Sequence, residues 1–371
     1  MAGGTRGAPR CARPREVENL AYIARRLARL SASTFVSVKV LHSISELADI
    51  AGPVVLSAGV FDGFHLGHRA VIERAIADAR AVGGTPVVVT FDPHPAAVLR
   101  PQSAPPLLTS TRHKLRLLAD AGIAHVLVLD FDAAFAAKPP EQFIAELAAA
   151  CRPLREICVG EDWAFGKDRA GNISLLGTLG KKLGFDAIGI LPVTVDGKSV
   201  SSTAIRAAVE SGELAAAARL LGREFSVLGT VIEGRRLGRT LGFPTANIRP
   251  ESEQLPPNGV YAVRACITSV AAEGTRRADL FSEFQVPSSG LKCPPPSVGG
   301  YRGIANVGVR PTVSSEGTHR LVEVHLFDFS SDLYGRDIEV FFGRFVRPEQ
   351  KFPSLDALRI QIASDVAVVR G

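Results

Sequence analysis

The pattern of apolar segments changes near residue 222, and this change constrains the fold more than any other feature. Between residues 35 and 221, short apolar runs alternate with stretches of helical periodicity. Strands that alternate with helices form a parallel sheet with helices on both faces. From residue 222 to 371 the chain is rich in Val, Gly and Thr at short spacing, which is typical of all-β domains. We therefore predict an α/β domain over 35–221 and a β domain over 222–371.

The periodicity also places the individual elements. In the first domain we expect strands at 54–60, 86–91, 125–129, 156–160 and 187–191. Helices are expected between them at 70–81, 111–121, 140–150 and 175–183. In the second domain we expect strands at 225–231, 259–267, 301–307, 319–326 and 337–347. A closing helix over 354–369 is expected to pack on the sheet.

The net charge is concentrated at the start of the chain. Of the net charge of +6, residues 1–34 contribute seven Arg and two Glu, which leaves about +1 for everything else. A nearly neutral folded body lacks the basic face of nucleic-acid binders, so we expect no nucleic-acid partner. We predict that residues 1–34 form a disordered basic extension with a short helix. Their composition also leaves open an organelle transit peptide or an over-extended translation start.

Several partners and compartments are disfavoured by composition. No run of 18 apolar residues occurs, so we expect no membrane span and no membrane partner. The five cysteines are odd in number and form no CxxC pair, which favours a reducing, cytoplasmic location without a disulfide framework. Residues 269–299 are rich in Gly, Pro, Ser and charge, which predicts a flexible insertion. The sequence leaves weak self-association open.

Ten residues, Gly59-Val-Phe-Asp-Gly-Phe-His-Leu-Gly-His68, stand where the first predicted strand turns into a helix. Glycines allow a tight turn and a close ligand approach, and free N–H groups at a helix start favour an anion. Two histidines three apart can donate to one phosphate group. Zinc binding would need further ligands, and a purely structural turn is the other alternative. We predict a phosphate site made by Gly59, Phe61, Asp62, His65, Gly67 and His68.

A second hydroxyl-rich turn, Val200-Ser-Ser-Thr-Ala-Ile-Arg206, precedes another helix. Its hydroxyls can cap that helix, and an Arg one turn inside can hold phosphate oxygens bidentately. We predict that Ser202, Thr203 and Arg206 bind phosphate, the alternative being an ordinary N-cap with a solvated Arg.

Two polar loops follow strands of the predicted parallel sheet, where ligands bind at the carboxyl ends. One contains Asp92 and His94, with a proline on each side of His94, and the other contains Asp162, Trp163 and Phe165. Aromatic and charged side chains in one loop favour a planar, charged ligand, and we predict a flavin or nucleotide contact here. Alternatively, the tryptophan only fills the edge of the core.

Two motifs of the β domain carry chemistry. Glycines at 234, 238 and 242 suggest a phosphate-cradling loop, although they do not match the Walker pattern. Within Pro-Thr-Ala-Asn, Thr245 and Asn247 offer oxygens suited to hydrated Mg²⁺. Glu323 alternates with two valines that face the other way, and on the inner face of the sheet its carboxylate could take a proton from an attacking hydroxyl.

These motifs together resemble a known family. The HxGH run and the SSTAIR run are similar to the two signatures of the nucleotidyltransferase superfamily. TFDPHP and VGEDWAFG between them resemble the adenylyltransferase half of prokaryotic bifunctional riboflavin kinase/FAD synthetase. LGFPTANI, NGVYAV, IANVGVRPT and EVHLFDF with DLYG resemble its riboflavin kinase half. The resemblance covers about residues 36–371 in the family's order, and Asp162 stands where the family often has Asn.

The resemblance implies a Rossmann-like nucleotidyltransferase sheet followed by a six-stranded Greek-key barrel with a terminal helix. It implies ATP-dependent phosphorylation of riboflavin to FMN and adenylylation of FMN to FAD, with Mg²⁺ and with riboflavin, FMN and ATP as binding partners. Glu323 would be the catalytic base of the kinase, and His65 and His68 would act in adenylyl transfer. Two alternatives are an adenylyltransferase acting on pantetheine phosphate and a flavin-binding protein without catalysis.

Overall fold

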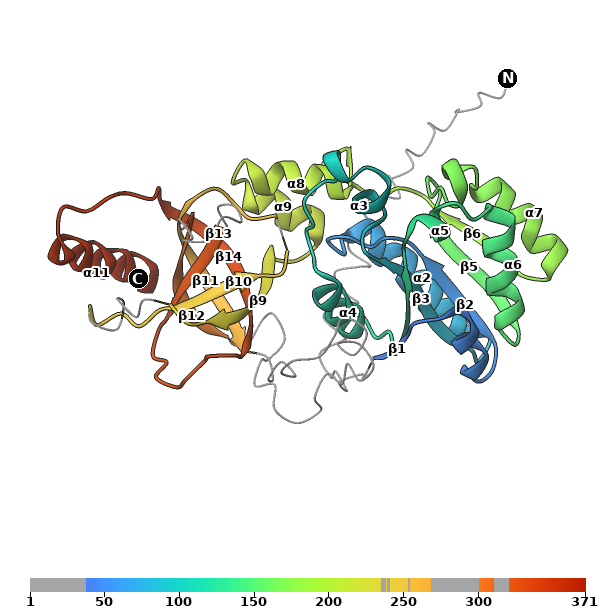
Figure 1. Ribbon diagram of the computed structural model, residues 1–371, viewed down its shortest axis with the longest axis horizontal. Coiled ribbons are helices and arrows are strands. Elements are labelled where there is room, and N and C mark those ends of the chain that lie inside the picture. Colours follow the sequence, from blue (N-terminus) through green and yellow to red (C-terminus); the bar gives the residue numbers. More distant parts are fainter. Residues whose placement is uncertain (1–37, 235–237, 239–240, 253, 268–299, 310–319) are drawn as a thin grey trace, which may run out of the picture. The chain divides into compact units, whose positions relative to one another are not determined.

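A computed structural model describes residues 38–234, 238, 241–252, 254–267, 300–309 and 320–371 (Figure 1). The predicted extension 1–34 and the predicted insertion 269–299 lie outside the described residues. Among the described residues, no helix is both long and apolar enough to cross a membrane.

The first part of the chain forms a six-stranded sheet in which every neighbouring pair is parallel. Its strands are β1 (Lys39–Leu41), β2 (Val54–Ala58), β3 (Thr85–Asp92), β4 (His125–Asp130), β5 (Leu154–Gly160) and β6 (Asp186–Ile190). Their order is β1-β4-β3-β2-β5-β6. The chain therefore winds to one side of β2 and then to the other. Ligands of such sheets bind at the carboxyl ends of the strands beside this reversal.

Helices cover both faces of this sheet (Figure 1). Helices α2 (Leu66–Ala81) and α4 (Thr111–Asp120) bury apolar residues against one face. Helices α6 (Pro140–Ala150) and α7 (Ile173–Leu183) do so on the other. The remaining elements of this part are η1 (Ile44–Asp49), α3 (Pro95–Leu99), η2 (Pro101–Ser103), α5 (Ala133–Ala136), η3 (Lys167–Arg169), β7 (Thr194–Val195), β8 (Lys198–Ser199), α8 (Ser202–Glu210) and α9 (Leu214–Leu221). The predicted two-faced α/β sheet is confirmed.

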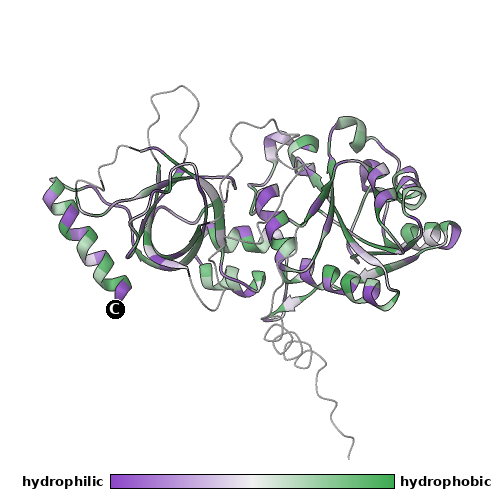
Figure 2. Cartoon of the chain, turned by 90° about the horizontal axis from the view of Figure 1, so that it is seen from below, coloured by the Kyte–Doolittle hydropathy of each residue, from purple (hydrophilic) through white to green (hydrophobic). Residues whose placement is uncertain are grey.

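The second part is a closed antiparallel barrel, seen as a ring in Figure 2. Its strands are β9 (Ser226–Ile232), β10 (Ala246–Pro250), β11 (Gly259–Ile267), β12 (Tyr301–Val309), β13 (Arg320–Leu326) and β14 (Asp337–Arg347). All six strands contribute apolar side chains to one buried cluster inside the ring. Helix α11 (Leu355–Arg370) packs on the outside through Val369, which contacts Val260, Ile304 and Phe327. The predicted six-stranded barrel with a terminal helix is confirmed.

Several details differ from the expectations from sequence, and the short elements α3, α5, α9, β7 and β8 were not expected. Strands β1 and β10 were not expected, because they have three and five residues and no clear alternation. Helix α2 begins at Leu66 rather than at residue 70, so His68 lies in its first turn. Cys151 and Cys158 are free and buried, but Cys266 is disulfide-bonded, which the cysteine count did not predict.

Candidate active sites

The first site is built on the turn between β2 and α2, here called the HxGH turn (residues 59–68). Phe61 and Phe64 adopt positive φ angles of 53° and 42°, which non-glycine residues rarely do. Such backbone strain concentrates at functional sites because the surrounding structure must hold it. A Cβ on Gly67 would lie 3.1 Å from the His65 ring, so glycine there lets the imidazole sit against the helix start.

Both histidines of the HxGH turn are neutral near pH 7. Burial is the main cause that lowers the pKa of His65 to about 4; Asp62 opposes this shift and Arg223 adds to it. Desolvation lowers the pKa of His68 well below its usual range, and His65 and Lys114 lower it further. The two rings stack with centroids 3.5 Å apart, an arrangement that two cations would not adopt. These side chains therefore act as neutral hydrogen-bond donors and acceptors.

The tautomer of His65 follows from its contacts. His65 caps α2, and its Nδ1 accepts a hydrogen bond from the backbone N–H of His68 at 3.3 Å. Its ring proton therefore sits on Nε2. The Nδ1 atom of His68 is buried and has no hydrogen-bond partner among the described residues. Phe61 supports the His68 ring edge-on, with centroids 5.3 Å apart.

Asp62 is a buried anchor of the HxGH turn rather than an open side chain. Its carboxylate accepts the N–H groups of Leu108 and Thr109 at 3.1 and 2.9 Å. It also accepts a charge-assisted hydrogen bond from Arg206 Nη2 at 2.5 Å. The Nε–H of Arg206 donates to the Pro106 carbonyl at 2.7 Å. Arg206 is thus oriented by the turn itself.

The second predicted signature meets the HxGH turn in space. Ser201 caps α8 by accepting from the Ala204 N–H, and the Ser202 hydroxyl donates to the Asp62 carbonyl at 2.9 Å. A cavity of about 330 Å³ opens at this junction. It is lined by Val60, Asp62, His68, His94, Arg100, Ser103, Pro105, Ser202, Thr203 and Arg206. Two segments about 140 residues apart therefore form one polar cavity, together with Arg100, Ser103 and Pro105, which the sequence analysis missed.

The two predicted loops lie differently with respect to this cavity. His94 lines it, and its Nδ1 accepts from the Ala96 N–H at 3.0 Å, while Asp92 ends β3. Trp163 stacks on Phe165 with centroids 4.3 Å apart, and both pack against the main α/β core. Asp162 is exposed. The contacts of Trp163 are those expected if it fills the edge of the core.

The second site lies on the outside of the barrel, which corrects one expectation. Val322 and Val324 are each 1% exposed and belong to the cluster inside the ring. Because side chains alternate along a strand, Glu323 points to the outer face, not to the inner face as predicted. Asn247 of β10 and Asn306 of β12 are its register partners on either side. These three residues form what we call the outer-face row.

Asn247 is the member of this row whose side chain is buried. It is 5% exposed, yet its Oδ1 atom has no hydrogen-bond partner among the described residues. A Cβ on Gly234 would lie 2.0 Å from Asn247 Nδ2, so glycine is required for the chain to cover this carboxamide. Buried polar atoms are normally paired, and an unpaired amide oxygen suits a hard cation. The Asn247 oxygen therefore suits a hard divalent cation.

The other glycines of the predicted loop have separate structural reasons. A Cβ on Gly238 would lie 2.4 Å from the Phe243 carbonyl and 2.9 Å from Thr245 Oγ1, so this glycine permits close approach to the Pro-Thr-Ala-Asn segment. Gly242 has a φ of +81°, which favours glycine. His325, next to Glu323 on the outer face, shares a hydrogen bond between its Nδ1 and the Pro244 carbonyl at 2.9 Å. The sequence analysis did not identify His325.

Another cavity, of about 370 Å³, opens where α11 meets the outer face of the barrel. Its lining consists of Gly300, Tyr301, Arg302, Phe327, Asp328 and Arg370. The Arg370 guanidinium lies 4.7 Å from the centre of the Phe327 ring and pairs with Asp328 at 2.8 Å. Phe327 follows Glu323 by four residues in the same segment. Because side chains alternate along an extended chain, an even spacing places the two side chains on the same face. Aromatic and cationic side chains thus lie on the face that carries Glu323.

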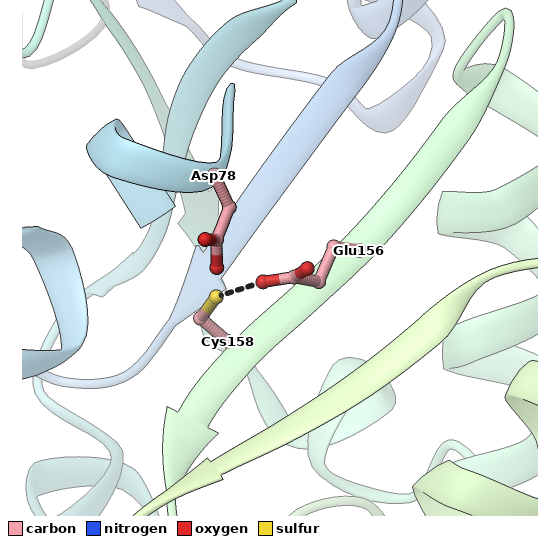
Figure 3. Close-up of side chains that lie close together, drawn as sticks. All are labelled: Asp78, Glu156 and Cys158. Carbon is pink, nitrogen blue, oxygen red and sulfur yellow. Dashed lines mark hydrogen bonds between the residues drawn. The ribbon is translucent and has the colours of Figure 1, made fainter. Parts of the chain in front are cut away.

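A third cluster of ligand-type side chains lies away from both cavities. Asp78 of α2 approaches Glu156 and Cys158 of β5 (Figure 3). The Cys158 thiol donates to Glu156 at 2.8 Å, and Asp78 is paired with Arg74. Burial is the main cause that raises the pKa of Glu156 to about 7, and burial with the nearby carboxylates raises the pKa of Cys158 far above its usual range. The cluster therefore shares protons near neutral pH, and its thiol is unreactive.

Comparison with known proteins finds a different family for each part of the chain. Residues 48–204 match the FAD synthetase family, and residues 221–371 match the riboflavin kinase family. The bifunctional riboflavin kinase/FMN adenylyltransferase of Escherichia coli K12 is 37% identical over 333 residues, which are 90% of this chain and 96% of that protein. The Haemophilus influenzae enzyme of the same name is 35% identical over 315 residues, 85% of this chain and 92% of that protein.

One solved structure is similar over nearly its whole length. It is described as a macrolide-efflux protein from Streptococcus pneumoniae, with a TM-score of 0.70 and 28% identity. The alignment covers 90% of this chain and 99% of that one.

The matches and the two sites define a two-part transferase that combines a nucleotidyltransferase sheet with a flavin kinase barrel. The chain belongs to the bifunctional riboflavin kinase/FMN adenylyltransferase family. It is an enzyme that phosphorylates riboflavin to FMN with ATP and then adenylylates FMN to FAD, releasing pyrophosphate.

Proposed function

We propose that the cavity at the HxGH turn carries out adenylyl transfer and that the outer-face row carries out riboflavin phosphorylation. The observation that most supports this division is that the two sites contain different kinds of side chain. One cavity gathers His68, Ser202 and Arg206 from two signatures, while the barrel presents a carboxylate beside a carboxamide oxygen that no described residue pairs. The first set suits phosphate oxygens, and the second suits a hydroxyl and a cation.

In adenylyl transfer, a phosphate oxygen of FMN attacks the α-phosphorus of ATP, and the bond to the pyrophosphate breaks. The reaction needs no protein nucleophile, because FMN supplies an anionic oxygen. His65 and His68, being neutral, donate hydrogen bonds to the oxygens on which charge develops. Arg206, oriented by Asp62, binds the departing pyrophosphate together with the hydroxyls of Ser202 and Thr203.

In the kinase step, Glu323 takes the proton from the ribityl 5′-hydroxyl as its oxygen attacks the γ-phosphorus of a second ATP. ADP leaves, and the product is FMN. The isoalloxazine ring lies along the outer face toward Phe327 and Arg370, where the cavity offers an aromatic ring and a cation. Positioning is the main contribution of the protein to phosphoryl transfer.

Mg²⁺ is the divalent ion that we assign to the kinase site. Asn247 and Thr245 would hold it, because the Asn247 oxygen is buried without a partner among the described residues and Thr245 belongs to the same short segment. When bound, the ion would neutralise charge on the phosphates. Gly234, Gly238 and Gly242 give the segment before it the close approach and the left-handed turn that it needs.

The remaining predicted residues are assigned supporting roles. Gly59, Phe61, Asp62 and Gly67 hold the HxGH turn, and His94 borders the nucleotide cavity. Asp92, Asp162, Trp163 and Phe165 shape the neighbouring sheet edge.

Purified full-length protein incubated with riboflavin and Mg·ATP, followed by chromatographic separation of flavins, tests the whole assignment. We expect FMN to rise first and FAD to follow, with one ADP and one pyrophosphate released per FAD. A protein without catalysis would leave riboflavin unchanged. An adenylyltransferase for pantetheine phosphate would release pyrophosphate with that substrate and no ADP with riboflavin.

A further inference from the structure

The HxGH turn rests on a buried lysine that its sequence signature does not contain. Lys114 of α4 is 4% exposed, and its ammonium donates to the Val60 carbonyl at 2.9 Å and to Thr90 Oγ1 at 3.0 Å. Thr90 Oγ1 in turn donates to the same Val60 carbonyl at 3.1 Å. One ammonium group therefore joins the end of β3, the start of the HxGH turn and helix α4.

The Lys114 ammonium faces polar groups at the nucleotide cavity, and these groups come from several elements. Val60, whose carbonyl it binds, lines the cavity. The charge is felt by His68 of α2 and His94 of α3, and it attracts Asp62 of the turn and Asp92 of β3. A cation at such a place, shielded from water, acts more strongly on phosphate charge than a surface lysine would.

Helix α4 holds this lysine rigidly, because its neighbours are fixed to the barrel. His113 Nε2 pairs with Glu339 of β14 at 3.0 Å, and Arg112 pairs with Asp337. Burial opposes the charge of Glu339, but His113 and Arg116 outweigh it and keep the pKa of Glu339 well below its usual range. A movement of the α4 backbone at Lys114 would disturb these contacts with β14.

We propose that Lys114 is a positioning residue for adenylyl transfer, which holds the HxGH turn and places a fixed positive charge beneath the phosphates of the bound nucleotide. The inference rests on the proposed assignment of adenylyl transfer to this cavity. A lysine that only supported the fold would affect both activities of the chain, or neither. Lys114 acts on one of them.

The pH dependence of adenylylation distinguishes the effect of the Lys114 charge from the effect of its packing. Burial lowers the pKa of Lys114 to about 8, although Asp62 and Asp92 oppose this shift. Burial lowers the pKa of both imidazoles that face it, His68 and His94, so neither ring changes charge near pH 8. Adenylylation should therefore fall as pH rises through about 8, as the ammonium loses its proton, while riboflavin phosphorylation by the same sample does not follow that curve.

The experiment compares the wild type with Lys114→Met, Lys114→Arg and the control Lys182→Met, whose lysine is exposed on α7. Lys114→Met should lower kcat/KM for FMN adenylylation by about tenfold to 100-fold, the loss expected for charged hydrogen bonds. Riboflavin phosphorylation and the control should stay within about twofold of the wild type. Lys114→Arg, whose charge persists to high pH, should abolish the decline above pH 8.

Three results would overturn the proposal. They are normal adenylylation in Lys114→Met, a flat wild-type profile between about pH 7 and 9.5, and a decline that persists unchanged in Lys114→Arg. If Lys114→Met fails to fold and loses both activities, the pH profiles of the wild type and of Lys114→Arg still test the proposal. His68→Ala, measured in the same assay, distinguishes a failure of the Lys114 proposal from a failure of the site assignment. If His68→Ala is inactive while the Lys114 variants are normal, only the lysine's role is lost; normal adenylylation in His68→Ala overturns the site assignment itself.

Discussion

The HxGH turn and the outer-face row differ in how their buried polar groups are paired. At the HxGH turn, the protein pairs its own polar groups. Lys114 and Arg223 donate to the carbonyls of Val60 and Gly63, and Asp62 holds Arg206. At the outer-face row, a buried oxygen of Asn247 has no partner in the part of the chain that the structure describes.

In the function that we propose, this difference follows from what each site binds. A rigid turn with neutral imidazoles is ready for charge that develops during adenylyl transfer, without reorganisation. An unpaired amide oxygen is costly unless a ligand pairs it, so the barrel site is completed by what it binds. The two halves should therefore respond separately, and differently, to substitution.

The largest expected effect is at the carboxylate of the outer-face row. Glu323→Gln should lower FMN formation by about 10²–10⁴-fold, because the proton acceptor is lost. Conversion of supplied FMN to FAD should continue at the wild-type rate. Separate assays of the two steps check this, and loss of both activities would contradict the division into two sites.

A somewhat smaller effect is expected at the HxGH turn. His68→Ala should slow adenylylation by about 10²–10³-fold, the usual cost of removing one hydrogen-bond donor from developing charge. Riboflavin phosphorylation should be unaffected, since the outer-face row does not contain this residue. An unchanged rate of FAD formation from FMN would remove His68 from the mechanism.

Displacing the Asn247 carboxamide tests the difference between the two sites, because it should affect the kinase step alone. In Gly234→Ala the new methyl group would meet Asn247 Nδ2 at 2.0 Å, so the carboxamide must shift. Displacement by about 1 Å can cost about 10²-fold, and only the kinase rate should fall. Gly177→Ala is the control, because a Cβ there meets nothing within 4 Å. Equal kinase rates in the two variants would show that Asn247 tolerates displacement.

Stability, rather than activity, should respond at the cluster of Asp78, Glu156 and Cys158. The folded-state pKa of Glu156, about 7, lies above its ordinary value of 4.5. The protonated Glu156 carboxyl therefore contributes stability that is fully present below pH 4.5 and is lost as the pH rises through about 7. Glu156→Gln should remove this loss and raise the free energy of unfolding at pH 8 by about 1 kcal/mol, allowing for solvent screening. Urea unfolding at pH 4 and pH 8 measures it. An equal change at both pH values would show that the carboxyl does not titrate as described.

The smallest effect is expected at Asp162, which is exposed. Asp162→Asn restores the residue frequent in the family and should change adenylylation by less than about twofold, as surface changes usually do. Steady-state kinetics with FMN and ATP check this. A large loss would reveal a role specific to the carboxylate.

Contiguous features of the chain were predictable, and contacts between distant segments were not. The HxGH turn, the Ser201 cap and the alternation of β13 all depend on neighbouring residues. Lys114 and Arg223 could not be predicted, because helix periodicity places a lysine on a face without saying which distant carbonyl it meets. Glu323 was assigned to the wrong face, although its apolar neighbours fill the interior of the barrel.

The sequence by itself determined the two kinds of sheet, the position of the HxGH turn and the family, because hydrophobic period and turn residues act over short distances. Only the tertiary structure decided the protonation of His65 and His68, the partner of Arg206 and the burial of the Asn247 oxygen away from any partner in the described segments. These depend on burial and on groups far apart in the chain, since desolvation and hydrogen bonding are set by what surrounds a group in space.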